Sequence, residues 1–98
     1  MAEERWSPVP DYAGWYEASD WGQVYSLPRA AAAGGLLHPK LNSRGYYQVG
    51  LCKYGRVTQA LVGRIVLAAF RGPCPPGKRV RYGPRGPADN SLENLRWG

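Results

Sequence analysis

The stretch Leu41–Phe70 limits the possible folds most, because it predicts a β-hairpin that runs directly into a helix. Alternate residues of Tyr46–Lys53 are apolar, which is the period of a strand with one buried face. Tyr54-Gly55 closes the hairpin, with the glycine suited to a positive φ, and Arg56–Ala60 is the return strand. The segment therefore predicts a central hairpin with a helix behind it.

The predicted helix, Leu61–Phe70, carries apolar side chains at positions 62, 65, 66 and 69. This spacing is typical of an amphipathic helix that packs against a sheet, and Gly72-Pro73 ends it. A chain of 98 residues has room for one small domain, residues 1–98, with a thin core. We therefore expect a small α+β domain.

The N-terminal part predicts a second hairpin. Trp15–Ser19 and Gln23–Leu27 are its strands, and Asp20-Trp21-Gly22 is its turn. The preceding stretch, Trp6–Gly14, is interrupted by prolines and is expected to be non-regular. In Pro28–Gly35, four alanines stand between Pro28 and the pair Gly34-Gly35. This run is too short for a stable helix, so we expect a loop of variable conformation there.

The C-terminal segment Val80–Trp97 predicts a short strand at Arg79–Tyr82, a loop at Gly83–Pro87 and a helical turn that opens near Asn90. Asn90 with Glu93 three residues later is a capping-box pattern. We expect Leu92, Leu95 and Trp97 to dock this end of the chain on the body of the domain.

Charge is distributed unevenly along the chain, whose formal net charge is +6. No acidic residue lies between Trp21 and Ala88. The cations of that stretch are Arg29, Lys40, Arg44, Lys53, Arg56, Arg64, Arg71, Lys78, Arg79, Arg81 and Arg85. A field of one sign favours a polyanion, most simply nucleic acid, and the alternative is a solvated basic face that aids solubility.

Other classes of site have little support in the sequence. Cys52 and Cys74 form neither a CxxC motif nor a disulfide framework, so we expect reduced thiols in a cytoplasmic protein, with a bridge or a metal as the alternative. His38 is the only histidine and has no carboxylate or thiol near it in sequence, which makes a metal-ligand role improbable. No apolar run approaches ~18 residues, so no membrane association is expected.

Two stretches carry a family resemblance. Trp6–Leu27 reads W-x-P-V-P-x-Y-x-G-x-Y-E-x-S-x-x-G-x-V-x-S-L and closely resembles the NUMOD-type motif at the N-terminus of many phage and homing HNH endonucleases. The resemblance implies that residues 6–27 assist DNA binding. The connector Arg71–Arg79 resembles that of actinobacterial-phage members, which implies a phage or prophage origin and hence the host bacterial cytoplasm.

Val80–Trp97 resembles the C-terminal half of HNH (His-Me finger) endonucleases, whose pattern runs roughly V-[ND]-H-x-D-G-x-x-x-N-N-x-x-E-N-L-x-W. The positions of this chain that match it are Val80, Asn90, Leu92, Glu93, Asn94, Leu95 and Trp97. The resemblance implies that residues 41–97 form an HNH-like region that ends in a ββα-metal-like element, expected here without the metal site.

The departures from that pattern concern its catalytic positions. Tyr82 stands in place of the general-base histidine, Arg81 in place of a metal-binding Asp or a polar Asn, and Pro84 in place of the loop's Asp. Gly63 occupies a second histidine position and, inside a helix, brings no obvious structural return. Asn94 resembles the second metal ligand. A phenol that titrates near pH ~10 is a poor base and a guanidinium repels a cation. We therefore expect a degenerate, catalytically inactive pseudo-nuclease with no cofactor.

The leading functional expectation is a protein of phage origin that binds double-stranded DNA through a basic surface. The residues expected to contact DNA are Lys40, Arg44, Lys53, Arg56, Arg64, Arg79, Arg81 and Arg85. One alternative is a protein-interaction module that targets a host protein, itself possibly DNA-binding. A second alternative is a residual metal-dependent DNA nickase that uses Asp89, Glu93 and Asn94. The sequence leaves the oligomeric state and the DNA site open.

Overall fold

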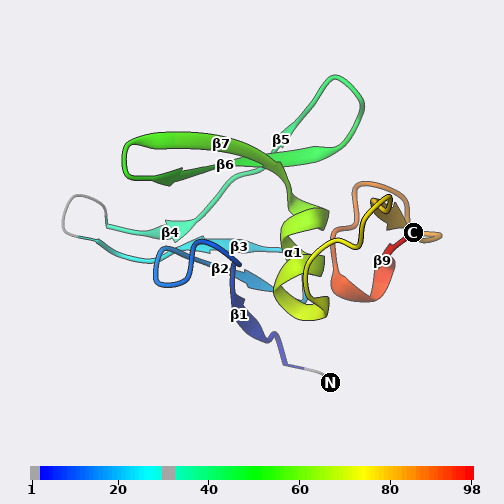
Figure 1. The fold of residues 1–98 in the computed structure, drawn as a ribbon, viewed down its shortest axis with the longest axis horizontal. Coiled ribbons are helices and arrows are strands. Elements are labelled where there is room, and N and C mark those ends of the chain that lie inside the picture. The colour runs from blue at the N-terminus through cyan, green and yellow to red at the C-terminus, as the bar shows by residue number, and fades with distance from the viewer. Residues whose placement is uncertain (1–2, 30–32) are drawn as a thin grey trace.

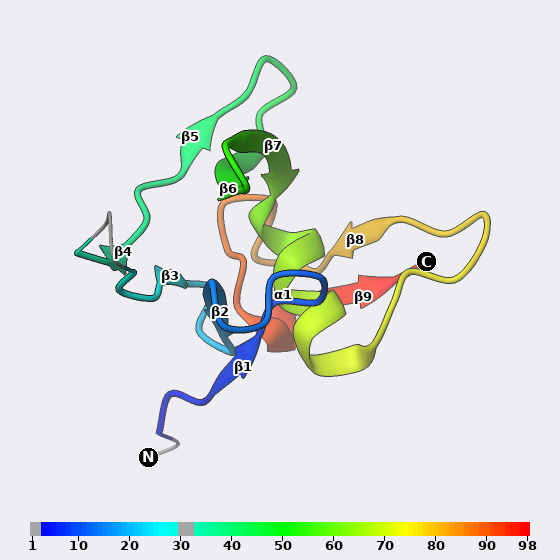
Figure 2. The same ribbon diagram turned by 60° about the vertical axis from the view of Figure 1, so that its left-hand side comes forward.

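A computed structural model of the chain describes residues 3–29 and 33–98. Three small antiparallel sheets surround a single α-helix in the described part of the chain, as Figures 1 and 2 show. The elements in chain order are β1 (Trp6–Pro8), β2 (Tyr16–Ser19), β3 (Val24–Ser26), β4 (Gly35–Leu36), β5 (Lys40–Leu41), β6 (Tyr47–Lys53), β7 (Arg56–Leu61), α1 (Val62–Arg71), β8 (Val80–Tyr82), the one-turn 3₁₀ helix η1 (Leu92–Asn94) and β9 (Leu95–Trp97). The predicted α+β class is confirmed.

Helix α1 organises the core because it contacts strands of all three sheets. Val62, Ile65 and Val66 are buried on it, as the apolar spacing predicts. Ala69 is only half-buried, and Leu67, which that spacing left out, is buried instead. The hydrophobic core around these helix residues also contains buried residues of β2, β3, β6 and the C-terminal segment. The helix starts directly after β7 and ends at Gly72, whose φ of +84° favours glycine. Within the described residues, no helix is long and apolar enough to cross a membrane.

The N-terminal sheet has the strand order β1-β2-β3-β4. Its central hairpin, β2 and β3, matches the prediction. Two further strands do not: Trp6–Pro8 pairs with β2, and Gly35–Leu36 pairs with β3. The expectations of a non-regular stretch and of a loop were therefore wrong at these residues, because pairing with a neighbouring strand overrode local composition. Residues 30–32 of the predicted loop lie outside the described residues.

The central hairpin forms as predicted, with Lys53 paired to Arg56 across a two-residue turn. Tyr54 and Gly55 both have positive φ, +53° and +75°, the geometry of a tight hairpin turn that matches the strand twist. β5 adds a third strand, and Lys40 pairs with Gln48 of β6. Val49 and Leu51 bury one side of β6 in the core.

The C-terminal segment closes on itself as a two-stranded ladder in which β8 pairs with β9. The expected capping box at Asn90 does not form. Instead, the Asp89 carboxylate accepts hydrogen bonds from the Ser91 backbone N–H and hydroxyl, at 2.9 and 2.6 Å, and only one 3₁₀ turn follows. Leu92 and Leu95 are buried as expected, whereas Trp97 is half-buried and donates its indole N–H to the Gly72 carbonyl at 3.3 Å.

Candidate nucleic-acid interface

Tyr82, the last residue of β8, packs its ring between two parts of the chain. It stacks on Tyr46, with 5.3 Å between ring centroids and 22° between ring planes. Its hydroxyl reaches α1, where a Cβ built on Gly63 would lie 2.9 Å from the phenol oxygen. The expectation that Gly63 brings no structural return is therefore wrong: the absent side chain makes the space that the Tyr82 hydroxyl fills.

Two buried polar atoms meet around Gly63 without a hydrogen bond from the described residues. They are the Tyr82 hydroxyl and the Asn90 Oδ1, and the latter would lie 3.2 Å from the same Cβ. Burial, and to a smaller extent Tyr46, raises the pKa of Tyr82 above its ordinary value. The phenol is therefore protonated at neutral pH, and it offers a hydrogen-bond donor.

A cleft of about 330 Å³ lies beside Tyr82, and we call it the arginine–tyrosine cleft. Its lining residues are Tyr46, Arg79, Val80, Arg81, Tyr82, Gly83, Gly86 and Pro87. The residues Arg79 and Arg81 are exposed, and neither forms an ion pair with a carboxylate of the described residues. None of the described residues that line the cleft is acidic, so its field is positive and suits a phosphate.

Asn94 frames the loop that closes one side of the arginine–tyrosine cleft. Its side-chain amide donates to the Gly86 and Asp89 carbonyls at 3.0 and 2.9 Å, and its Oδ1 accepts the Arg85 backbone N–H at 3.2 Å. The residue is only 5% exposed. The structure thus uses Asn94, which the family pattern relates to a metal ligand, to hold the loop.

Arg85 differs from the other predicted DNA contacts because its charge is offset within the fold. Its Nη1 lies 3.5 Å from the Asp89 carboxylate and 2.5 Å from that of Glu93. These contacts raise the pKa of Arg85, with Glu93 the larger cause. The hydrogen bonds from Ser91, and to a smaller extent Arg85, lower the pKa of Asp89. Arg85 therefore adds little free positive charge.

The remaining predicted cations lie on several surfaces. Lys40 is on β5, Arg44 is exposed in the turn before β6, and Arg56 is exposed at the start of β7. The Lys53 ammonium donates to the Asp11 backbone carbonyl and lies 5.5 Å from the Tyr12 ring centroid. Lys53 therefore contacts the loop between β1 and β2, which we count with β1–β4 as the N-terminal module. Arg64 lines a separate groove beside α1. The structure thus does not gather all eight residues at one place.

Sequence reasoning missed a polar face on the central sheet, which we call the glutamine face and define as Lys40, Gln48 and Gln59. Gln48 donates to the Gln59 side chain at 3.4 Å and accepts from that of Asn42 at the same distance. Gly50 keeps the face flat, because a Cβ there would lie 3.1 Å from the Gln59 amide nitrogen. His38 lines the same shallow hollow. The alternation of β6 predicts that Gln48 and Gly50 share a face. Only the register of β5 and β7 shows that Lys40 and Gln59 lie on that face too.

The described residues do not fit the divalent metal that the HNH resemblance implies. Residues 3–29 and 33–98 contain no group of three or more His, Cys, Asp or Glu side chains placed to hold an ion. The side-chain amide of Asn94 is hydrogen-bonded to the loop. The Asp89 carboxylate accepts a hydrogen bond from Ser91, and the Glu93 carboxylate pairs with Arg85. We therefore derive no chemical step through a metal.

Comparison with known proteins places this geometry in a family context. A family model described as the NUMOD4 motif matches residues 4–52. The DNA endonuclease I-HmuI of Bacillus phage SP01 is 33% identical over 94 residues, which are 95% of this chain and 51% of that protein. A structure of the HNH homing endonuclease I-HmuI, described as showing DNA binding and cleavage, matches with a TM-score of 0.82 at 29% identity, over 96% of this chain and 52% of that one.

These comparisons confirm the NUMOD and HNH resemblances and correct one expectation. The chain spans about half the length of the relative that it matches. The expectation that the chain is not an enzyme was wrong, because a relative aligned along nearly the whole of it is a DNA endonuclease.

Proposed function

The chain belongs to the NUMOD4 motif family, and from this premise we propose that it binds double-stranded DNA through the arginine–tyrosine cleft and the glutamine face. The observation that carries the proposal is the pair of exposed, unneutralised guanidiniums of Arg79 and Arg81 in a cleft without acidic residues. The similarity along the chain to a DNA endonuclease of a phage supports it.

The two surfaces are linked in the chain through the start of β6. Tyr46 lines the cleft and directly precedes β6, the strand that carries Gln48 of the glutamine face. A DNA major groove admits a two-stranded β-ribbon, and glutamine amides and lysine ammoniums are suited to hydrogen-bond base edges. Arginines position the backbone by binding phosphates. The cleft therefore anchors the backbone, and the glutamine face meets the bases.

Duplex binding is tested by the fluorescence anisotropy of a labelled duplex at low salt. We expect saturable binding that weakens steeply as salt rises, because each phosphate contact contributes a log–log slope of about −0.9. Charge reversal of Arg79 and Arg81 together, the two exposed cations of the arginine–tyrosine cleft, is expected to weaken binding to all sequences alike. A folded protein with no measurable duplex binding at low salt would overturn the proposal and favour a host protein as partner.

A second candidate function, cleavage of a DNA strand, is favoured by the similarity to a DNA endonuclease. Asp89, in the loop that Asn94 holds, and Glu93, in η1, both form ion pairs with Arg85. The test is incubation of supercoiled plasmid with the protein and Mg²⁺, Mn²⁺, Ni²⁺ or Zn²⁺. Nicking that co-purifies with the protein and disappears in an Asp89→Asn/Glu93→Gln variant supports cleavage, whereas no nicked product with any of the four ions argues against it.

A further inference from the structure

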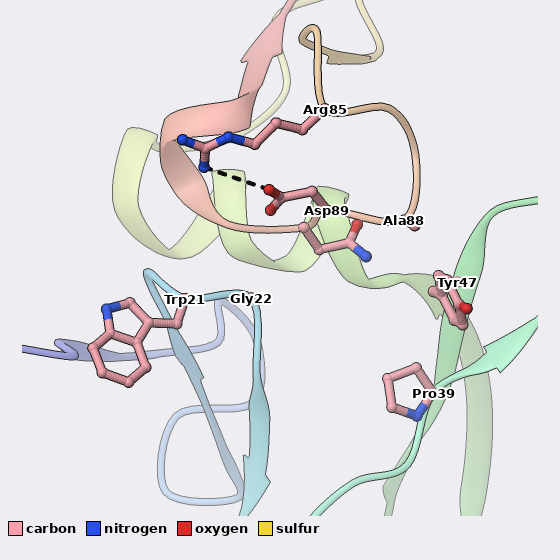
Figure 3. A pocket seen from close by; sticks show the side chains of 8 residues that line it. Trp21, Gly22, Pro39, Tyr47, Arg85, Ala88 and Asp89 are labelled. Atoms are coloured by element: carbon pink, nitrogen blue, oxygen red, sulfur yellow. Dashed lines mark hydrogen bonds and ion pairs between the residues drawn. The ribbon is translucent and has the colours of Figure 1, made fainter.

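A second cleft, of about 470 Å³, opens where the N-terminal module meets the C-terminal loop (Figure 3). Its lining residues are Trp21, Gly22, Pro39, Tyr47, Arg85, Ala88, Asp89 and Asn90. Figure 3 shows Trp21 on one side of the opening and Pro39 and Tyr47 on the other, with Arg85 and Asp89 above. We call it the Trp21 cleft.

The walls of the Trp21 cleft are fixed by contacts between the two parts of the chain. The Leu92 backbone N–H donates to the Asp20 carbonyl at 2.8 Å. A Cβ on Gly22 would lie 2.7 Å from the carbonyl carbon and oxygen of Asn90, so only glycine permits this approach. The cleft is therefore formed before any ligand arrives, which lowers the entropic cost of binding.

Trp21 presents a large unused aromatic surface to this cleft. Its side chain belongs to a residue that is 56% exposed, and within the described residues it has no aromatic partner and its indole N–H makes no hydrogen bond. Asn90 also lines the cleft and is only 9% exposed. Its Oδ1 is buried toward Gly63, and its Nδ2 donates no hydrogen bond within residues 3–29 and 33–98. An exposed indole and a free amide donor thus line one hollow.

The charges of the Trp21 cleft point to an uncharged ligand. Among the described residues that line it, Arg85 is the one cation, and it is bonded to Asp89 in the cleft and to Glu93. These residues therefore leave no excess positive charge for a phosphate. The Asp89 carboxylate and the Asn90 amide offer hydrogen-bond acceptors and donors around apolar walls. A flat heterocycle with both donors and acceptors at its edge fits this chemistry.

We propose that the Trp21 cleft holds one unpaired nucleobase of the bound DNA, stacked on the Trp21 indole beside the Asp89–Asn90 edge. This inference rests on the proposed DNA binding and adds a site that recognises a base outside the duplex stack. Unpaired bases bind proteins by stacking on aromatic rings and by hydrogen bonds at their exposed edges. The phosphates on either side of the base remain with the cationic surfaces.

The test compares a fully paired duplex with the same duplex carrying one bulged 2-aminopurine. We expect the wild-type protein to prefer the bulged duplex and to quench the 2-aminopurine emission. Trp21→Ala is expected to weaken binding to the bulged duplex by about 5- to 150-fold and to abolish the quenching. Trp21→Phe is expected to keep part of the preference.

Trp6→Ala is the matched control, since Trp6 is also exposed, at 38%, but meets Tyr25 edge-on away from the cleft. It is expected to leave the preference intact, and a thermal melt followed by circular dichroism verifies that each variant is folded. Equal wild-type affinity for the two duplexes, or a preference that survives in Trp21→Ala, overturns the inference alone. Loss of binding to both duplexes by the wild-type protein overturns the proposed DNA binding as well.

Discussion

Arg81 lies in β8 and Arg85 in the turn that follows it, but the fold gives their charges different environments. Arg81 is exposed in the arginine–tyrosine cleft and has no carboxylate partner among the described residues, whereas Arg85 bonds to Asp89 and Glu93. The acid-free stretch ends at Ala88, and the first two acids beyond it fold back onto Arg85. A charge count along the chain thus overstates the free positive field near that boundary.

The largest expected effect comes from removing Asn94, which holds the loop that carries Arg85. Asn94→Ala leaves the Gly86 and Asp89 carbonyls and the Arg85 N–H without their partner. We expect a loss of about 2–4 kcal/mol in the free energy of unfolding, measured by urea denaturation, because buried polar groups left unpaired cost ~1–3 kcal/mol.

Asn90→Ala is the matched control for that experiment. Asn90 is also buried, but its Oδ1 has no hydrogen-bond partner in the described part of the chain, so its removal relieves an unsatisfied acceptor. We expect a smaller loss than for Asn94→Ala. A greater loss for Asn90→Ala than for Asn94→Ala would contradict the view that Asn94 frames the loop.

A smaller effect is expected where Tyr82 packs on α1, beneath Arg81. Gly63→Ala places a methyl group 2.9 Å from the Tyr82 hydroxyl oxygen, and crowding of this kind costs roughly 1–3 kcal/mol. The gain in helix propensity, about 1 kcal/mol, offsets part of that cost. We expect net destabilisation in the wild-type background and net stabilisation when Tyr82→Phe removes the hydroxyl.

Denaturation of the two single variants and the double variant measures this coupling as a double-mutant cycle. Additive effects would show that the Tyr82 hydroxyl does not occupy the space above Gly63. The same cycle, repeated for duplex binding, shows whether the packing of Tyr82 matters to the cleft beside Arg81.

The smallest effect concerns Asp89, one of the two carboxylates that neutralise Arg85. Its pKa is lowered in the folded protein, so it contributes stability that is present above its unfolded pKa of about 3.9 and is lost as pH falls through the folded pKa. We therefore expect the wild-type protein to lose stability below about pH 4 more steeply than Asp89→Asn. Parallel acid-unfolding curves for the two proteins would exclude this contribution.

Much of the fold was predictable because its signals are local. The hairpin turn at Tyr54-Gly55 and the apolar spacing of α1 follow from neighbouring residues. The strands β1 and β4 were missed, since each depends on pairing with a strand elsewhere in the chain. The capping box at Asn90 was wrong because Asp89, one residue earlier, accepts the Ser91 bonds instead.

The candidate site was predictable in composition but not in arrangement. The sequence identifies Arg79 and Arg81 as cations, yet only the fold shows that they share an acid-free cleft while Arg85 is neutralised. The glycine at position 63 could not be explained from the helix alone. It leaves room for the hydroxyl of Tyr82, which belongs to β8. The glutamine face required the register of three strands.

The salt dependence of duplex binding tests the contrast between the two arginines most directly. The proteins compared are the wild type, Arg81→Ala and a double variant, Arg85→Ala/Glu93→Gln, which removes the ion pair without changing net charge. If Arg81 meets a phosphate and Arg85 does not, the log–log slope falls in magnitude by about 0.9 for Arg81→Ala and stays unchanged for the double variant. An unchanged slope for Arg81→Ala, or an equal fall for both, would contradict the account.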